Sequence, residues 1–261
     1  MTTNAPPPYV PAHDLLRDKT VLITAAAGAG IGFATAKRCA EEGARLFISD
    51  IHEKRTAEAA QALEEISGQP VGHRLCNVRE DQEVRDLVAS AIEEMGRIDV
   101  VINNAGLGGE VSVVDMTDDQ WTSVLDITLN SVFRMTRAVL PHMSARKSGV
   151  IINNASVLGW RAQVGQAHYA AAKAGVMAFT RCSALEAAAD GIRINAVAPS
   201  IAVHPFLKKT TPEELLKELE SKEAFGRGAE PWEVANVMVF LASDYSSYMT
   251  GEVVSVSSQR A

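Results

Sequence analysis

The sequence predicts one α/β domain built on a doubly wound, seven-stranded parallel sheet. Seven short apolar runs alternate along the chain with longer segments whose apolar residues recur every three or four positions. The short runs are apolar along their whole length, which is typical of parallel strands that helices cover on both faces. A chain of 261 residues without an obvious linker is long enough for one large domain with a substantial core.

Each element follows from its own segment. The predicted strands, rich in β-branched residues, are Thr20–Thr24, Arg45–Asp50, Val71–Cys76, Ile98–Asn103, Val150–Asn154, Arg193–Ala198 and Val253–Val256. The predicted helices are Ile31–Glu42, Lys54–Ile66, Asp81–Met95, Trp121–Ala145, Tyr169–Ala189 and Trp232–Ala242. Because a helix separates each strand from the next, all the strands can run in the same direction.

Two segments lie outside this alternation. Residues 1–11 hold four prolines and few groups that could pack, so we expect a flexible N-terminal arm outside the fold of residues 12–261. The stretch Val203–Gly228 carries a charged helical segment at Pro212–Lys222. Long excursions of this kind often cover a cleft, and we expect a substrate loop at about residues 200–228.

Composition and charge exclude several classes of function. The net charge of −7 and the 5% aromatic content argue against a nucleic-acid partner. The cysteines Cys39, Cys76 and Cys182 are widely spaced, and the histidines have no metal-ligand spacing, so neither a disulfide framework nor a metal site is expected. No apolar stretch has the length of a membrane helix, and no signal peptide is recognisable. We expect a cytoplasmic protein that acts on a small molecule.

A glycine-rich turn follows the first predicted strand. Gly28, Gly30, Ile31 and Gly32 lie where this strand passes into the first helix. Glycines let the backbone approach a ligand closely, and a helix N-terminus offers free N–H groups to a pyrophosphate. The alternative is a turn whose glycines serve only close packing.

An acidic residue ends the second strand. Asp50 follows the glycines by about twenty residues, where a carboxylate can accept hydrogen bonds from the adenosine ribose hydroxyls of a dinucleotide. The same carboxylate would repel a 2′-phosphate, and the glycine turn has no Lys or Arg to neutralise one. NAD(H) is therefore expected rather than NADP(H), although Lys54 and Arg55 stand nearby.

Three polar residues form a candidate proton-transfer group. Tyr169 and Lys173 are four residues apart on a predicted helix, so both project from one face. A nearby ammonium favours the phenolate, and we expect it to lower the pKa of Tyr169. Ser156 follows the fifth strand and can hold a substrate carbonyl beside the tyrosine.

In order and spacing, these residues resemble the short-chain dehydrogenase/reductase family from Lys19 to Val256, in particular actinobacterial members of the steroid ring-degradation type and 3-oxoacyl thioester reductases. Further motifs carry the resemblance: Asn103-Asn104-Ala105-Gly106, Asn195–Pro199 and Thr250-Gly251. It implies a Rossmann fold with Ser156, Tyr169 and Lys173 as catalytic residues. It also implies a nicotinamide cofactor against Gly28, Gly30, Ile31, Gly32, Asp50, Ile51, Asn77, Val78, Asn104, Ala105, Gly106, Tyr169, Lys173, Pro199 and Ile201.

The chain departs from the family pattern at several of these places. Ala25 stands where the family has its first glycine, and Asn77 stands where an acid is usual after the third strand. Thr128 replaces the asparagine that helps to hold a relay water, so the relay uses either the threonine hydroxyl or another route. Ser200 replaces a glycine, and His204 stands where a threonine often reaches the nicotinamide amide.

The expected activity is hydride transfer between NAD(H) and a secondary alcohol or ketone. Trp160, Phe206 and Leu207 suggest a hydrophobic, cyclic substrate, and the basic residues Arg161, Lys208 and Lys209 can meet a carboxylate or phosphate. The resemblance implies a cyclic hydroxy- or keto-acyl coenzyme A thioester of steroid catabolism. Two alternatives stay open: an NADPH-dependent 3-oxoacyl thioester reductase, and a dinucleotide-binding sensor without catalytic activity. The family's helix pairing across two-fold axes implies a homo-tetramer.

Overall fold

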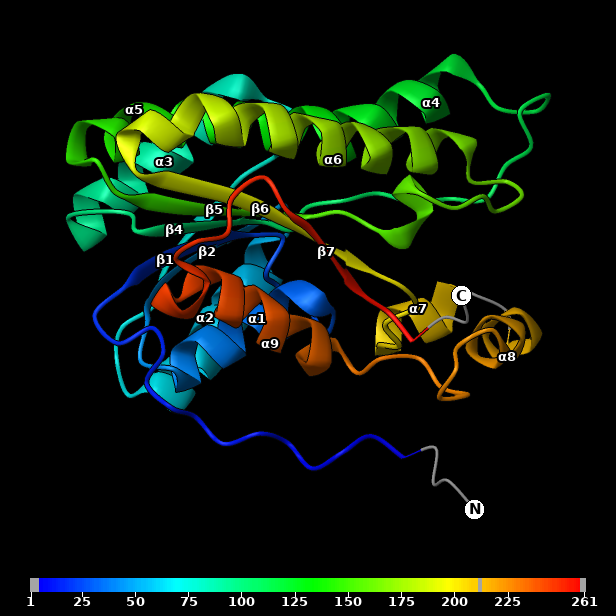
Figure 1. Ribbon diagram of the computed structural model, residues 1–261, viewed down its shortest axis with the longest axis horizontal. Coiled ribbons are helices and arrows are strands. Elements are labelled where there is room, and N and C mark those ends of the chain that lie inside the picture. Colours follow the sequence, from blue (N-terminus) through cyan, green and yellow to red (C-terminus); the bar gives the residue numbers. More distant parts are fainter. Residues whose placement is uncertain (1–4, 211–212, 259–261) are drawn as a thin grey trace.

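The order in which strands are added to the sheet reverses at its middle. The chain builds outward from β1 to β3 on one side and then from β4 to β7 on the other. The computed structural model describes residues 5–210 and 213–258. Seven strands, all parallel, form one sheet in the order β3-β2-β1-β4-β5-β6-β7 (Figure 1). The strands are β1 Thr20–Thr24, β2 Arg45–Asp50, β3 Gly72–Leu75, β4 Val100–Asn103, β5 Gly149–Asn154, β6 Ile192–Pro199 and β7 Val253–Val256. The doubly wound Rossmann topology expected from the sequence is confirmed.

Helices cover both faces of the sheet. One layer holds α1 Ile31–Glu41, α2 Glu53–Ser67 and α9 Pro231–Ala242 (Figure 1). The other holds α3 Asp81–Met95, α4 Asp118–Leu125, α5 Ser131–Arg146 and α6 Ala167–Ala187. Two short helices, α7 Pro205–Thr210 and α8 Glu213–Ser221, lie beyond the ends of β6 and β7. None of the helices in the described ranges is long and apolar enough to cross a lipid bilayer.

The central strand β1 shows why the strands are apolar throughout. Val21 and Ile23 pack into the core beneath α1 and α9, and Leu22 packs into the core on the opposite side. All three side chains are fully buried. Since successive side chains of a strand point to opposite faces, two covered faces require apolar residues at every position.

Most predicted boundaries agree with the structure, and the main difference lies in one long helix. The bounds of β1, β2, β7 and α3 are those predicted. The helix expected at Trp121–Ala145 is instead interrupted by a π-helical segment, Asp126–Asn130, between α4 and α5. There the Ser131 N–H donates to the Asp126 carbonyl, one residue beyond the usual α-helical partner. Such a bulge often marks a functional position, and this one contains Thr128.

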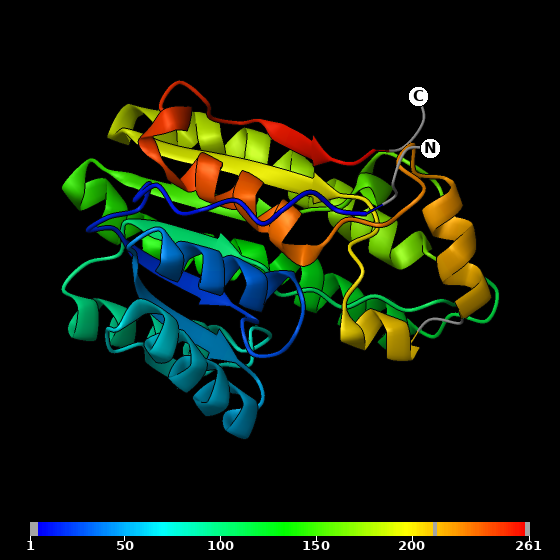
Figure 2. The ribbon, with the colours of Figure 1, turned by 90° about the horizontal axis from the view of Figure 1, so that it is seen from below.

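The N-terminal arm is attached to the fold, contrary to the expectation that it lies outside. The Tyr9 hydroxyl donates to the Glu41 carboxylate at 2.5 Å, and its ring packs edge-on against Trp232 of α9. Arg38 of α1 donates to the carbonyls of Val10 and Pro11. These contacts fix the described end of the arm along α1 and α9 (Figure 2). Residues 1–4 lie outside the described ranges.

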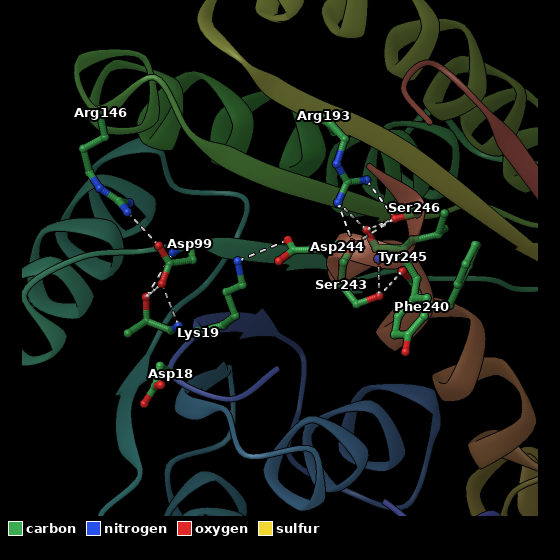
Figure 3. A network of polar contacts seen from close by, with 12 residues as sticks. Asp18, Lys19, Asp99, Arg146, Arg193, Phe240, Ser243, Asp244, Tyr245 and Ser246 are labelled. Carbon is green, nitrogen blue, oxygen red and sulfur yellow. Dashed lines mark hydrogen bonds and ion pairs between the residues drawn. The ribbon is translucent and has the colours of Figure 1, made fainter. Parts of the chain in front are cut away.

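Polar contacts join the elements at the amino-terminal edge of the sheet (Figure 3). Asp99 accepts hydrogen bonds from Arg146 and Arg97, at 2.7 Å and 2.9 Å, and from Thr20. Arg193, at the start of β6, donates to the Ser246 hydroxyl and to carbonyls at the end of α9. This edge therefore serves assembly of the fold, while the candidate catalytic residues lie at the opposite edge.

Candidate active site

The glycine turn forms an open cradle at the N-terminus of α1. A Cβ on Gly32 would lie 2.3 Å from the Ala25 carbonyl oxygen, so only glycine fits there. Gly28 has a φ of +136° and no atom within 4 Å of the place a Cβ would take, and Gly30 precedes α1 without a side-chain cap. The first N–H groups of α1 thus have no side-chain cap, which suits a pyrophosphate, and the nearest side chain to Gly30 is the His204 ring. Ala25 itself adopts a left-handed φ of +50°.

Asp50 holds the shape of this turn. Its carboxylate accepts hydrogen bonds from the N–H groups of Ala27, at 3.2 Å, and Ile51, at 2.8 Å. It is only 8% exposed, and this burial raises the pKa of Asp50, against the lowering effect of those two N–H groups and of Arg55. The Arg55 guanidinium lies 4.0 Å away and is half-exposed. The acid is therefore at the carboxyl end of β2, as expected, and adjoins the glycine turn.

Three further residues of the expected cofactor contacts lie along the same edge. Ile51 is exposed immediately after Asp50, and Val78 is buried. The side chain of Asn77 accepts from the Arg79 N–H and thereby shapes the turn that precedes α3. The Cys76 N–H donates to the Asp50 carbonyl, which keeps the segment after β3 beside the end of β2.

Asn104 connects the glycine turn to the centre of the sheet. Its amide Nδ2 donates to the carbonyls of Thr24, at 3.3 Å, and Ala25, at 3.0 Å. Its Oδ1 accepts from the Asn154 amide at 2.9 Å. The Thr24 hydroxyl accepts from the N–H groups of Asn104 and Ala105. The ends of β1, β4 and β5 are thereby held together by paired polar groups, as buried polar groups require.

Lys173 is buried beside this network. Its Nζ donates to the Asn154 carbonyl at 2.5 Å, and the side chain is 2% exposed. Burial lowers the pKa of Lys173 to about 7. A Cβ on Gly106 would lie 3.5 Å from this Nζ, so the loop after β4 is in direct contact with the lysine.

Tyr169 lies one helical turn before Lys173, and the Lys173 ammonium is 5.5 Å from the centre of its ring. Burial raises the pKa of Tyr169 to about 12, and a hydrogen bond with Ser156 acts in the opposite direction. The lowered pKa expected from the sequence is therefore wrong. The reason is that desolvation of the phenolate outweighs the hydrogen bond with Ser156, while the Lys173 Nζ is bonded to the Asn154 carbonyl.

Ser156 completes the group. It is almost fully buried, and its hydroxyl accepts from the Leu158 N–H at 3.2 Å at the start of a short 3₁₀ turn, Val157–Gly159. The backbone after β5 thereby fixes the hydroxyl next to Tyr169. The structure thus brings together the three residues that the spacing singled out.

Thr128 is hydrogen-bonded to the loop after β4. Its hydroxyl accepts from the Leu107 N–H at 3.0 Å and donates to the Leu107 carbonyl at 3.1 Å. A hydroxyl has one hydrogen, and here it is given to a carbonyl. Of the two relay routes left open by the sequence, this geometry favours the one that does not pass through the threonine hydroxyl.

A cavity of about 740 Å³ lies between the segment after Ser156 and α8. Its walls include Val157 and Leu158 on one side and Leu215 and Leu219 on the other. Arg161 lies at its rim and makes no ion pair with any described residue. Trp160 is half-exposed nearby, whereas the side chains of Phe206 and Lys209, and residues 211–212, lie outside the described part of the chain.

Pro199 and Ile201 frame the start of the expected substrate loop. Pro199 ends β6 opposite Val256, and the Ile201 carbonyl accepts from the Ala229 N–H at 2.8 Å. They lie at the same edge of the sheet as the other expected cofactor contacts, on its β6 side.

Sequence reasoning missed two residues here. Asn154 holds both Asn104 and Lys173, and its place two residues before Ser156 at the end of a strand was an available signal. His168 precedes Tyr169, is 2% exposed, and has a buried Nδ1 without a hydrogen-bond partner among the described residues. No sequence pattern distinguishes such a buried histidine.

Comparison with known proteins identifies the family. A family model described as enoyl-(acyl carrier protein) reductase matches residues 25–258. The chain is 58% identical over 99% of both chains to the (5R,7aS)-5-hydroxy-7a-methyl-1-oxo-2,3,5,6,7,7a-hexahydro-1H-indene-carboxyl-CoA reductase of Mycobacterium tuberculosis. The chain belongs to the short-chain dehydrogenase/reductase family. The short-chain dehydrogenase/reductase assignment makes it an NAD(P)-dependent oxidoreductase, as the sequence predicted.

Other members of the short-chain dehydrogenase/reductase family support this assignment. The 3-oxoacyl-acyl-carrier-protein reductase FabG of Thermotoga maritima is 39% identical over 92% of this chain and 97% of its own length. A crystal structure of a short chain dehydrogenase from Mycobacterium smegmatis matches with a TM-score of 0.88 and 54% identity over 99% of both chains. Levodione reductase matches with a TM-score of 0.88 at 35% identity, over 93% of this chain and 97% of its own.

Proposed function

We propose that the protein transfers a hydride between NAD(H) and a cyclic substrate that carries a secondary hydroxyl or keto group on an acyl coenzyme A thioester. The observation that carries this proposal is the close approach of Ser156, Tyr169 and Lys173. The chain that follows Ser156 lines a cavity with both apolar and charged side chains. The nicotinamide supplies or accepts the hydride.

The three side chains divide the proton chemistry. In reduction, Tyr169 Oη gives its proton to the substrate oxygen, and Ser156 Oγ holds that oxygen in place. Lys173 Nζ, with a pKa of about 7, can replace the lost proton near neutral pH. Oxidation uses the same groups in the reverse order.

The residues present fit a dinucleotide. Gly28 and Gly30 leave a cradle that a Cβ would narrow, and the buried Asp50 carboxylate stands at its side. A 2′-phosphate beside this carboxylate would be repelled, while Arg55 is half-exposed and 4.0 Å away. This charge balance supports NAD(H) over NADP(H).

The substrate class is supported by the cavity and by one relative. The cavity walls near Ser156 are apolar, and Arg161 at the rim can meet a phosphate of the thioester carrier. A relative that is 58% identical is named as a hydroxy-oxo-indene-carboxyl-CoA reductase. A fused-ring acyl group next to Ser156 and Tyr169, with the carrier toward the rim, agrees with both.

An NADPH-dependent 3-oxoacyl thioester reductase is the second candidate. It is favoured by the 39% identity to FabG, which is named as a reductase of 3-oxoacyl groups on an acyl carrier protein. The buried Asp50 argues against NADPH.

The deciding experiment follows absorbance of reduced nicotinamide at fixed enzyme concentration with four combinations. A fused-ring hydroxy- or keto-acyl-CoA and acetoacetyl-CoA are each tested with NAD(H) and with NADP(H). We expect the highest kcat/KM for the fused-ring thioester with NAD(H). A preference for acetoacetyl-CoA with NADPH would establish the second candidate, and no activity in any of the four combinations would reject both.

The remaining expectations concern assembly and location. Phe133 on α5 and Leu185 on α6 expose apolar side chains, with Leu185 80% exposed, and a homo-tetramer would cover them. Light scattering coupled to gel filtration measures the mass.

Cytoplasmic location stays a prediction, to be checked by cell fractionation.

A further inference from the structure

Asp126 is the meeting point of three side chains from different parts of the chain. It is the first residue of the π-helical segment, and its carboxylate accepts a hydrogen bond from each of them. Arg134 Nη2 lies 2.7 Å and Asn130 Nδ2 lies 3.0 Å from Oδ1, and Arg79 Nε lies 3.3 Å from Oδ2. Both oxygens are therefore paired, and the orientation of the carboxylate is fixed.

The carboxylate of Asp126 is ionised at neutral pH. Burial by itself raises the pKa of Asp126, but the hydrogen bonds from Asn130, Arg134 and Arg79 outweigh burial and lower the pKa overall. The side chain is 16% exposed and that of Arg134 is 18% exposed. Because hydrogen bonds between charged groups are stronger than those between neutral groups, this pair firmly connects the π-helical segment to α5.

On one side, these contacts hold the turn after β3. The Arg134 guanidinium donates to the Val78 carbonyl at 3.4 Å. The Arg79 guanidinium binds Asp126, and the Arg79 N–H donates to Asn77 Oδ1 at 3.2 Å. Through the two arginines, the carboxylate therefore fixes the turn of residues 77–79, which contains the expected cofactor contacts Asn77 and Val78.

This turn borders the adenosine half of the expected cofactor site. It follows directly on Cys76, whose N–H donates to the Asp50 carbonyl. Asp50 stands where the acidic residue of a dinucleotide-binding fold contacts the adenosine ribose. A shift of the turn would therefore change the surroundings of the adenosine.

On the other side, the π-helical segment holds the loop that contacts the catalytic lysine. Thr128, two residues after Asp126, exchanges two hydrogen bonds with the backbone of Leu107. A Cβ on the preceding Gly106 would lie 3.5 Å from Lys173 Nζ and 4.0 Å from Thr128 Oγ1. The loop thus contacts both the threonine and the lysine, and a shift of the π-helical segment would change the space around Lys173 Nζ.

We propose that Asp126 is a positioning residue that places the adenosine-side turn and the loop beside Lys173 at the same time. It needs no contact with cofactor or substrate, since it acts through Arg79 and Arg134 on one side and through Thr128 on the other. Cofactor affinity and turnover therefore both depend on this carboxylate. The inference rests on the proposed function, because it needs a dinucleotide bound at the carboxyl edge of the sheet.

Two measurements test the two effects separately. Isothermal titration with ADP-ribose, which has the adenosine half of the cofactor but no nicotinamide, measures the effect on the turn. Absorbance of reduced nicotinamide at saturating NADH, with the fused-ring keto-acyl-CoA, measures kcat.

The variants remove the carboxylate or only one of its links. Asp126→Ala deletes it, and Asp126→Asn keeps its shape and one acceptor oxygen without the charge. Arg79→Met breaks only the link to the turn. Asp118→Asn removes the same charge at an exposed position of α4 and is the matched control. Circular dichroism melting checks that each variant is folded, and if Asp126→Ala is not, Asp126→Asn is judged by the same two measurements.

We expect Asp126→Ala to weaken ADP-ribose binding by about tenfold, as for a lost hydrogen bond between charged groups. It should also lower kcat by about tenfold or more, because small displacements near the reacting groups are costly. Asp126→Asn should lose less of both, and Asp118→Asn should match the wild type. Arg79→Met should weaken ADP-ribose binding but keep the wild-type kcat. The double variant of Arg79→Met and Asp126→Ala should lose less affinity than the product of the two single losses, because the two groups share one contact.

Wild-type ADP-ribose affinity and kcat in the Asp126 variants would overturn the inference, as would a lower melting temperature as their only effect. Single losses that multiply fully in the double variant would also overturn it, because Arg79 and Asp126 would then act independently. Failure of the wild type to bind either ADP-ribose or NADH would reject the proposed function, and the inference with it.

Discussion

Lys173 Nζ donates a 2.5 Å hydrogen bond to the Asn154 carbonyl, and the amide of the same Asn154 donates to Asn104. Asn104 in turn holds the carbonyl of Ala25 in the glycine turn. One continuous set of hydrogen bonds therefore joins the cofactor cradle to the lysine beside Tyr169. A dinucleotide that displaced the turn would also displace the lysine, so the two halves of the site are positioned together.

Removal of the Tyr169 hydroxyl should separate binding from chemistry. We expect Tyr169→Phe to lower kcat by about 10²–10⁴, because no general acid remains at the substrate oxygen. The dissociation constant for NADH, measured by fluorescence, should stay close to the wild-type value. Tyr245→Phe, an exposed tyrosine at the opposite edge of the sheet, is the matched control and should keep full activity. Undiminished kcat in Tyr169→Phe would rule out the proton donor proposed here.

The buried Lys173 should make stability rise with pH. Its pKa is about 7 in the fold and has an ordinary value of 10.5 in an unfolded chain. Between these values the unfolded state binds more protons, so the folded state gains stability as pH increases. Without added cofactor, the melting temperature of the wild type should therefore rise relative to that of Lys173→Met as the pH increases from 7 to 9.5. Lys54→Met, on the exposed start of α2, should melt in parallel with wild type; a parallel curve for Lys173→Met would contradict the prediction.

The charge of Asp50 should decide between the two dinucleotides. Asp50→Asn keeps an acceptor for the Ala27 N–H but removes the repulsion of a 2′-phosphate. We expect the ratio of the NADP to the NAD dissociation constant to fall by about tenfold or more, since like charges in a partly buried site repel strongly. Titration calorimetry measures both constants. Glu58→Gln removes the same charge at a position farther along α2. It should leave the ratio of the NADP to the NAD dissociation constant unchanged.

Ala25 should be improved by the family's glycine. A left-handed φ of +50° costs an alanine about 1–2 kcal/mol, and glycine loses about 0.4–1 kcal/mol through its freer unfolded chain. Ala25→Gly should therefore raise the free energy of unfolding by about 0.5–1 kcal/mol in urea. Ala26→Gly, at the adjacent buried alanine with no positive φ, should lower it. A loss of stability in both variants would show that the conformation at Ala25 is not strained.

Asp99 should stabilise the fold except in acid. Burial alone raises its pKa, but hydrogen bonds from Arg146, Thr20 and Arg97 outweigh burial and hold the pKa at about 2. This stabilisation, about 2 kcal/mol, is complete above pH 4 and is lost as pH falls toward 2. Urea unfolding at pH 7 should show the loss in Asp99→Asn, and the difference from wild type should shrink at pH 3. Asp86 forms an exposed ion pair with Arg74, and the free energy of unfolding of Asp86→Asn should stay within about 0.5 kcal/mol of the wild-type value at both pH 7 and pH 3.

Most of the fold follows from local patterns. β1 and β2 have the predicted bounds because fully buried strands are apolar at every position and polar or turn residues end them. The π-helical segment at Asp126–Asn130 could not be predicted, because its residues suit an α-helix equally well. Its form coincides with a tertiary contact, the two hydrogen bonds between Thr128 and Leu107.

The sequence by itself determined the doubly wound sheet, the glycine turn with Asp50, and the spacing of Ser156, Tyr169 and Lys173. Each depends on periodicity or on short-range geometry, which neighbouring residues specify. Only the tertiary structure decided the ionisation of that group, because burial raises the pKa of Tyr169 and lowers that of Lys173. It also decided the attachment of Tyr9 to Glu41 and the position of His204 beside Gly30. Desolvation and such contacts arise between segments far apart in the chain, so no local pattern records them.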